Sequence, residues 1–266
     1  MRRPTERTAY LKATIQSIIR TYIYVDVVDS FLETLPGVTP TGGTLFLQSL
    51  PLVQRYVVST ALHLAIGLCV ILGIEMWYDI ASLVGVGLLN QSPSTWPPCH
   101  DRPWRTRSLH EFWSRRWHQI LRHTFMVYGG YPGEWLAGDV GRLFGVFLAS
   151  GIYHEVGFYL GGSSIDWKVI AFFVLQAAGI LAEKSYTAYT GRRVGGWLGF
   201  SWAALFVVIL GQMCSESFDI YNAIGDCDSQ AILANSWMER GAGGRAIVPP
   251  VVSPTRRLIF PLIRGA

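Results

Sequence analysis

The feature that most constrains this chain is an uncharged apolar run at residues 56–74, YVVSTALHLAIGLCVILGI. As an α-helix it would be about 28 Å long, close to the roughly 30 Å hydrocarbon core of a bilayer. Only 15% of the residues are charged and the mean hydropathy is +0.30, whereas an ordinary soluble domain carries roughly 25% charged residues. The sequence therefore predicts an integral membrane protein.

Three later segments, 141–160, 168–183 and 194–213, are also predicted to span the membrane. Residues 76–90 are apolar but short and contain Asp79. A full span, a re-entrant piece and an interfacial arm all remain open for this segment, because its length is borderline for crossing. The expected fold is all-α, a polytopic transmembrane helix bundle of about four to five spans.

The N-terminal residues 10–35 mix apolar side chains with frequent charges, among them Lys12, Arg20 and Asp26. This pattern predicts an amphipathic helix that lies in the membrane interface. We therefore expect an N-terminal interfacial helix and loop over 1–55 and a membrane domain over 56–213. Residues 214–266 are expected to form a Gly/Pro-rich tail.

Basic residues indicate the orientation of the spans. Segment 100–122 carries six arginines, and 184–193 carries Lys184, Arg192 and Arg193, whereas 161–166 carries no basic residue. If 141–160 and 168–183 both cross, the two basic loops lie on one side of the membrane. The positive-inside rule places that side in the cytosol.

His154 interrupts the apolar span 141–160, in SGIYHEVG. It lies about 20 Å along the helix, and ionisable groups at such depth are costly and usually functional. A packed, purely structural histidine is the alternative. A neutral imidazole can accept a proton from an alcohol, which suits acyl transfer from a thioester. His63, in the earlier span, has no charged neighbour in sequence, and we interpret it as structural.

The segment LHEFWSRRWHQILRH, residues 109–123, crowds aromatic rings, arginines and histidines together. Ser108 and Glu111 fit a capping box, and the segment has no Gly or Pro. Trp113 and Trp117 fall on an apolar stripe at helical spacing, and His118 falls on a polar one. This predicts an amphipathic helix at the membrane surface, and a plain interfacial helix without a catalytic role remains an alternative.

Two other interpretations of this segment are disfavoured. The pair His110–Glu111 is not followed by a histidine at the spacing of a zinc site, so no metal is expected. Nucleic-acid binding is not expected either, since the net charge is only +4 and membrane spans flank the segment.

Residues 112–119, FWSRRWHQ, resemble the signature of the wax-synthase branch of the membrane-bound O-acyltransferase (MBOAT) superfamily. A second resemblance is the small-residue stretch ASGIYH, which ends at His154. The two motifs occur in the family's order, and the resemblance covers about 90–210.

This resemblance implies a polytopic enzyme of the endoplasmic reticulum that moves an acyl group, most often acetyl, from acyl-CoA to a lipophilic alcohol. The acceptor implied is a terpenoid or meroterpenoid of fungal secondary metabolism. No bound cofactor is expected, and acetyl-CoA acts as co-substrate. His154 and His118 are the implied catalytic residues. The implied substrate-binding residues are Trp113, Arg115, Arg116, Trp117 and Gln119.

Members of this superfamily have eight or more spans, whereas this chain supports about four or five. The alternative function is therefore a non-catalytic polytopic membrane protein: a truncated family member, a scaffold or a transporter-like protein. It predicts that substituting His154 or His118 leaves product profiles unchanged.

Overall fold

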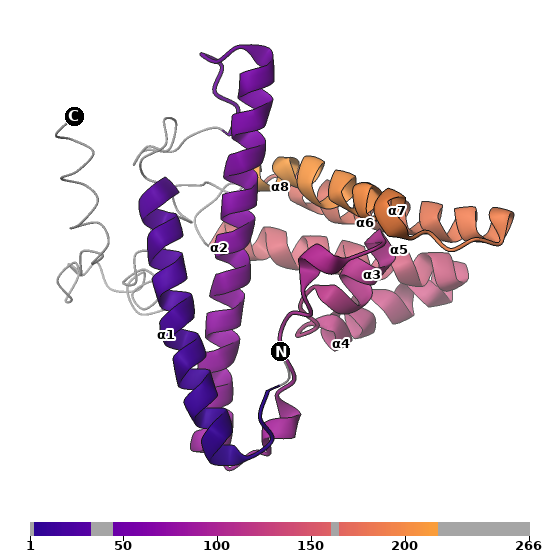
Figure 1. The fold of residues 1–266 in the computed structure, drawn as a ribbon. Coiled ribbons are helices and arrows are strands. Elements are labelled where there is room, and N and C mark those ends of the chain that lie inside the picture. The colour runs from indigo at the N-terminus through magenta and orange to yellow at the C-terminus, as the bar shows by residue number, and fades with distance from the viewer. Residues whose placement is uncertain (1–2, 33–44, 161–164, 218–266) are drawn as a thin grey trace. The chain divides into compact units, whose positions relative to one another are not determined.

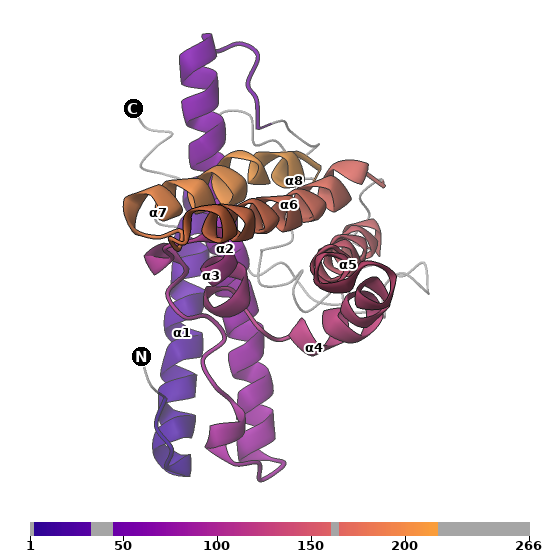
Figure 2. The ribbon, with the colours of Figure 1, turned by 90° about the vertical axis from the view of Figure 1, so that its right-hand side faces the viewer.

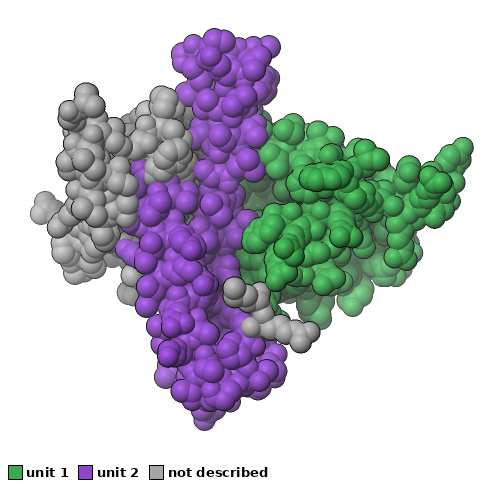
Figure 3. Space-filling model, viewed as in Figure 1, with its two compact units in different colours: residues 1–2, 97–217 green, residues 3–96, 218–266 purple. Residues whose placement is uncertain are grey.

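The structure of the chain, a computed structural model, describes residues 3–32, 45–160 and 165–217 (Figure 1). Throughout these ranges the regular elements are helices, and no strand occurs in them. The described residues fall into two compact units, one formed by 97–217 and the other by 3–96 (Figure 3). The all-α fold expected from the sequence is confirmed.

In the unit formed by 3–96, two long helices, α1 (Arg7–Leu32) and α2 (Leu52–Gly87), lie side by side. The segments 56–74 and 76–90, which the sequence analysis separated, belong up to Gly87 to one continuous 36-residue helix. The boundary expected between them is wrong, because nothing near Glu75 breaks a helix. A short 3₁₀ turn, Pro93–Thr95, follows.

The carboxylate of Asp79 is tolerated inside the apolar helix α2 because it is paired. Asp79 is fully buried and forms an ion pair with Arg3. The Arg3 guanidinium carbon also lies 5.5 Å from the ring centroid of Tyr78 and 5.7 Å from that of Tyr10. Asp79, the residue that made a span over 76–90 doubtful, is thus neutralised by the N-terminal segment.

Helix α1 confirms that residues 10–35 are largely helical. It buries small polar residues such as Thr14 and Thr21, while Ile15, Ile19 and Ile23 are exposed. This distribution suits a helix that contacts lipid. Its location in the membrane interface stays a prediction.

In the unit formed by 97–217, α5 (Tyr131–Leu160) packs against α6 (Trp167–Thr190). The approach is close at Gly151, where an added Cβ would lie only 3.0 Å from the Ile170 Cα. A core of eight buried residues holds the unit together, namely Leu109, Phe147, Val169, Phe172, Phe173, Ala177, Ile180 and Ala203. Asp166 caps the start of α6, and Gly191, at φ 68°, ends it.

Residues 122–160 form a helical hairpin. The first arm comprises α4 (Arg122–Phe125), a π-helical segment (Met126–Gly130) and the start of α5. The helix breaks at Ala137 and at Gly138, whose φ of 58° favours glycine. The second arm then returns beside the first (Figure 2).

Glycines allow the backbones of the two arms to approach each other closely. A Cβ added at Gly129 would lie 2.0 Å from the Gly145 carbonyl oxygen, and one added at Gly133 would lie 2.1 Å from the Gly141 carbonyl oxygen. Only glycine permits such contact, as in small-residue helix interfaces in membranes. The sequence analysis did not foresee this hairpin.

The last helical stretch consists of α7 (Gly196–Ala204), a π-helical segment (Leu205–Ile209) and α8 (Gly211–Ser217). It agrees with the predicted span 194–213. Within the described ranges, four helical stretches are long and apolar enough to cross a membrane: Leu52–Gly87, Arg122–Leu160, Trp167–Thr190 and Gly196–Cys214. The chain is an integral membrane protein. Of the loop expected within 1–55, residues 33–44 lie outside the described residues, and so does most of the tail expected over 214–266.

Candidate active site

The segment LHEFWSRRWHQILRH begins as predicted. The Ser108 hydroxyl oxygen accepts a hydrogen bond from the Glu111 N–H (2.9 Å), and the Glu111 carboxylate accepts one from the Arg107 N–H (2.8 Å). The Ser108 half of the predicted capping box is therefore confirmed. In a capping box the Glu111 carboxylate would accept from the Ser108 N–H. Here it accepts from the N–H of the preceding residue, Arg107.

The prediction of one amphipathic helix over 109–123 is wrong. Helix α3 covers only Leu109–Glu111, and a π-helical segment, Phe112–Arg116, follows it. The backbone leaves the helix at Trp117, where ψ is 161°. π-Helical segments are frequent at functional sites. This one ends just before His118, so His118 lies in a turn rather than on a helix face.

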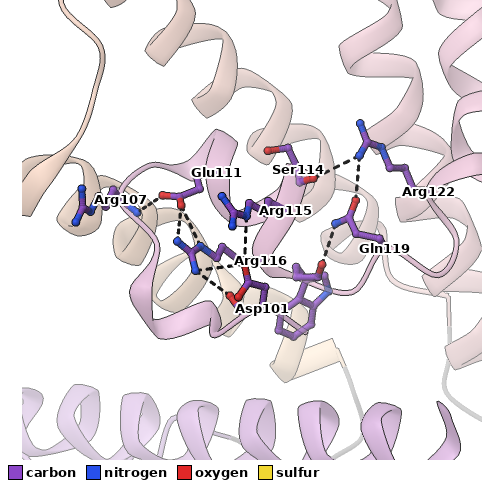
Figure 4. A network of polar contacts seen from close by, with 9 residues as sticks. Asp101, Arg107, Glu111, Ser114, Arg115, Arg116, Gln119 and Arg122 are labelled. Atoms are coloured by element: carbon purple, nitrogen blue, oxygen red, sulfur yellow. Dashed lines mark hydrogen bonds and ion pairs between the residues drawn. The ribbon is translucent and has the colours of Figure 1, made fainter. Parts of the chain in front are cut away.

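Side-chain hydrogen bonds of Gln119 and Arg122 stabilise this turn (Figure 4). The sequence analysis had given Gln119 as a substrate-binding residue. The Gln119 amide donates hydrogen bonds to the carbonyl oxygens of Trp113 (3.0 Å) and Trp117 (2.8 Å). Arg122 donates to the Gln119 side-chain oxygen (3.4 Å). These bonds replace the helical hydrogen bonds that the segment gives up.

Arg116 joins the segment at residues 109–123, called the motif below, to the preceding loop. Its guanidinium donates two hydrogen bonds to Glu111 (2.6 and 2.9 Å) and one to the Asp101 carbonyl oxygen (3.1 Å). Burial alone would raise the pKa of Glu111, but the bonds from Arg116 and Arg107 outweigh it and lower the pKa. Arg115 is exposed and pairs with the Asp101 carboxylate (3.1 Å). Figure 4 shows both arginines turned to these acidic partners.

Helix α6 anchors the motif through two buried polar residues. The Glu183 carboxylate accepts from the N–H groups of Leu109 (2.6 Å) and His110 (2.9 Å). Gln176 accepts from the Trp113 indole N–H (3.2 Å) and donates to the Phe206 carbonyl oxygen (3.1 Å). The motif therefore runs along α6 rather than lying apart on a surface.

Sequence reasoning missed Gln176 and Glu183. The available signal was two polar residues, two helical turns apart, in the otherwise apolar run KVIAFFVLQAAGILAE. Residues seven apart lie on one face of a helix, and buried polar groups in a membrane seek partners.

A cavity of about 480 Å³ lies between the motif, the hairpin and α6. The motif contributes Trp113, Trp117, His118 and Gln119, and the hairpin contributes Ser150 and His154. The structure thus brings the two predicted catalytic histidines to one cavity. Arg115 and Arg116 are not among its lining residues, whereas the other predicted site residues are.

His154 is oriented by its own helix. Its Nδ1 lies 2.7 Å from the Ser150 carbonyl oxygen. Because a carbonyl oxygen can only accept, Nδ1 carries the proton, and the neutral ring keeps an unprotonated Nε2. The ring stacks on Phe173, with centroids 4.6 Å apart. This arrangement presents a base on a fixed, apolar support.

His118 is also kept neutral. Burial, together with the neighbouring His100 and His154 rings, lowers its pKa to about 4. Its ring lies 5.5 Å from that of Trp117 and 6.0 Å from that of His100, centroid to centroid. A neutral imidazole can donate one hydrogen bond and accept one.

Charged side chains also line the cavity. Arg142 pairs with Glu134 (3.2 Å) and with Asp139, while Arg122 and Lys184 add positive charge. Of the six arginines in 100–122, only Arg122 is among the lining residues. Among the residues that the structure describes, no group of three or more His, Cys, Asp or Glu side chains is placed to hold a metal ion.

The sequence of this chain is similar to a known protein family and to several characterised proteins. Residues 96–175 match the model of the membrane bound O-acyl transferase family. The chain is 26% identical over 196 residues to acetyltransferase spyB of Aspergillus fumigatus, covering 70% of this chain and 33% of that protein. It is 27% identical over 197 residues to acetyltransferase eriL of Hericium erinaceus, covering 67% of this chain and 48% of that protein.

A plant relative matches a shorter part. Acyl-CoA–sterol O-acyltransferase 1 of Arabidopsis thaliana is 37% identical over 92 residues, which cover 30% of this chain and 25% of that protein. The chain thus spans between a quarter and a half of these relatives. No solved structure matches it.

Proposed function

We propose that this chain, whose residues 96–175 match the membrane bound O-acyl transferase family, is a member of that family and transfers an acyl group from acyl-CoA to the hydroxyl of a lipophilic alcohol. The observation that carries the proposal is the shared cavity, where His118 and His154 meet although 36 positions separate them in the sequence. Two neutral imidazoles in one largely apolar cavity suit acyl transfer, which needs a base and a hydrogen-bond donor.

In the proposed reaction, Nε2 of His154 takes the proton of the acceptor hydroxyl. The hydroxyl oxygen attacks the thioester carbonyl carbon, and negative charge develops on the carbonyl oxygen. His118 donates a hydrogen bond to that oxygen. The C–S bond then breaks, the ester is released, and the CoA thiolate takes the proton back from His154. No covalent acyl-enzyme forms.

We assign supporting roles to the aromatic and basic residues of the site. Trp113 and Trp117 form apolar walls against which a lipophilic alcohol can pack. Arg122 and Lys184 are positioned to attract the phosphates of the CoA donor. Gln119 acts by holding the turn that presents His118. The ion pairs of Arg115 and Arg116 favour a structural role for both residues over the substrate contact suggested by the resemblance.

The proposed acyl donor rests on the names of the relatives, whereas the proposed acceptor and location rest on the family resemblance of the sequence. Two of the relatives are fungal acetyltransferases, which supports acetyl-CoA as donor. A terpenoid or meroterpenoid alcohol is the proposed acceptor, and the endoplasmic reticulum is the proposed location.

The test is an assay of microsomes that contain the chain, with labelled acetyl-CoA or a labelled long-chain acyl-CoA and a panel of terpenoid alcohols. Ester formation with acetyl-CoA, lost in His154→Ala, is the expected result. If His154→Ala formed ester at the rate of the unmodified protein, the proposal would be refuted. A preference for the long-chain donor would refute the acetyl assignment alone.

A further inference from the structure

His100, in the loop that precedes the motif, is in an unusual state. Both of its ring nitrogens are buried, and neither has a hydrogen-bond partner among the residues that the structure describes. The loop itself is fixed, because the Asp101 N–H donates to the Arg116 carbonyl oxygen (3.0 Å) and Arg116 donates to the Asp101 carbonyl oxygen (3.1 Å). Buried polar groups are nearly always satisfied, so a partner for His100 has to be identified.

His118 has the matching need. Its Nδ1 is buried and likewise lacks a partner within the described part of the chain. The rings of His100 and His118 meet edge to face, with centroids 6.0 Å apart and planes at 89°. The two rings form no direct hydrogen bond, but one water can link two nitrogens roughly 5 Å apart, a separation that ring centroids 6.0 Å apart allow. One water between the rings would satisfy nitrogens of both.

The state of Nδ1 decides what His118 can do on the cavity side. A neutral imidazole carries one proton, on either Nδ1 or Nε2. If Nδ1 is unprotonated and accepts a hydrogen bond, Nε2 must carry the proton and can donate it. Only that tautomer can stabilise the oxyanion of the proposed reaction. If Nδ1 held the proton, Nε2 would present a lone pair to a negatively charged oxygen.

We propose that His100 is a positioning residue: its ring N–H donates to one bridging water, which in turn donates a hydrogen bond to His118 Nδ1 and so fixes the Nε2–H tautomer of His118. Burial keeps both rings neutral by lowering the pKa of each to about 4. The two cavity histidines then hold opposite tautomers: His154 is a base at Nε2, and His118 is a donor at Nε2. The catalytic benefit, though not the tautomer itself, rests on the function proposed above.

Two substitutions of His100 separate positioning from packing. His100 also packs edge-on against Trp117, with centroids 5.4 Å apart, so a purely structural role is the competing explanation. In the acyl-transfer assay, His100→Gln keeps a group that can hydrogen-bond the water, whereas His100→Phe keeps only an aromatic ring. Positioning predicts that kcat falls about 10- to 100-fold in His100→Phe, with KM little changed, and that Gln restores most of it. Packing predicts the reverse order, with Phe active and Gln impaired, and that order would overturn the proposal.

A second measurement does not depend on activity. Nitrogen-15 NMR of histidine-labelled protein in liposomes distinguishes protonated from unprotonated ring nitrogens, and the His118→Asn variant identifies the His118 signals. We expect one tautomer of His118, with the proton on Nε2, and a mixture of tautomers in His100→Phe. An unchanged tautomer in His100→Phe would overturn the proposal. The expected change in a protein that forms no ester would support the positioning role while refuting the proposed function.

The dependence on His118 supplies a final check. An asparagine at this position has a fixed amide donor and no tautomers. In the His118→Asn background, His100→Phe should therefore cost less than twofold in kcat, compared with the 10- to 100-fold loss expected when His118 is present. Equal losses in both backgrounds would overturn the proposal.

Discussion

The glycine contacts of the hairpin lead to a quantitative prediction about stability. In Gly145→Ala, the new Cβ would lie 2.0 Å from the Gly129 carbonyl oxygen, which belongs to backbone and cannot rotate away. The two arms must separate, and overpacking of this kind costs about 1–3 kcal/mol. Gly157→Ala, on the same helix, is the matched control, because its Cβ meets nothing within 4 Å. Both variants gain the same helical preference of alanine over glycine, about 1 kcal/mol.

The difference between the two variants therefore isolates the contact. At about 2–4 °C per kcal/mol for a chain of this size, Gly145→Ala should melt roughly 2–12 °C below Gly157→Ala. Intrinsic tryptophan fluorescence during heating, in one detergent and at one scan rate, measures this difference. Acyl transfer should fall as well, because both arms line the cavity. Identical melting temperatures for the two variants would refute the close packing of the arms.

Three further predictions concern the site. Glu183→Leu leaves the N–H groups of Leu109 and His110 without an acceptor. Thermal melts should therefore show that the free energy of unfolding falls by about 1–3 kcal/mol or more. Arg122→Ala should raise the KM for acetyl-CoA about tenfold, since it removes one charged contact, whereas the KM of Arg115→Ala should match that of the unmodified protein. The lowered pKa of His100, about 4, means that the unfolded chain binds more protons between about pH 4 and 6.5. Stability should therefore fall as the pH drops through that window, and melts at about pH 7 and about pH 5 should show a smaller fall in His100→Gln.

The local signals in the sequence were reliable where the interactions are local. The capping serine, Ser108, was identified from its spacing to Glu111. The spans were found because hydropathy over one helix does not depend on its neighbours. His154 was singled out because an ionisable group in an apolar run must be explained within that run.

The errors arose where contacts distant in sequence decide the structure. The pattern of 109–123 fits a helix, but bonds from Gln119 to two carbonyl oxygens stabilise a turn instead. Gly195 and Gly199, four positions apart, fit the spacing of a small-residue contact between helices. A Cβ at Gly199 would meet the Arg107 carbonyl oxygen at 1.9 Å, and one at Gly195 would meet nothing within 4 Å. Small-residue spacing alone does not say which backbone approaches.

The arginines of the motif illustrate a further limit. A cluster of basic residues near a membrane suggests binding of anionic groups, whether lipid or CoA. Arg116 instead pairs with Glu111 and Asp101, and Asp101 lies 15 positions away. Charge counts cannot distinguish a cation paired with a carboxylate from one that lines a cavity. Only the folded chain separates Arg116 from Arg122.

The central claim is that His154 acts as the base of an acyl transfer, and the most direct measurement is kcat for His154→Gln beside His63→Gln in proteoliposomes. Gln keeps the polarity of the side chain but cannot take a proton, and His63 is a described histidine in another apolar helix, α2. The account predicts that kcat falls about 10²- to 10⁴-fold in His154→Gln, the typical contribution of a general base, and that His63→Gln stays within a few-fold of the unmodified protein. Equal turnover by the two variants would contradict it.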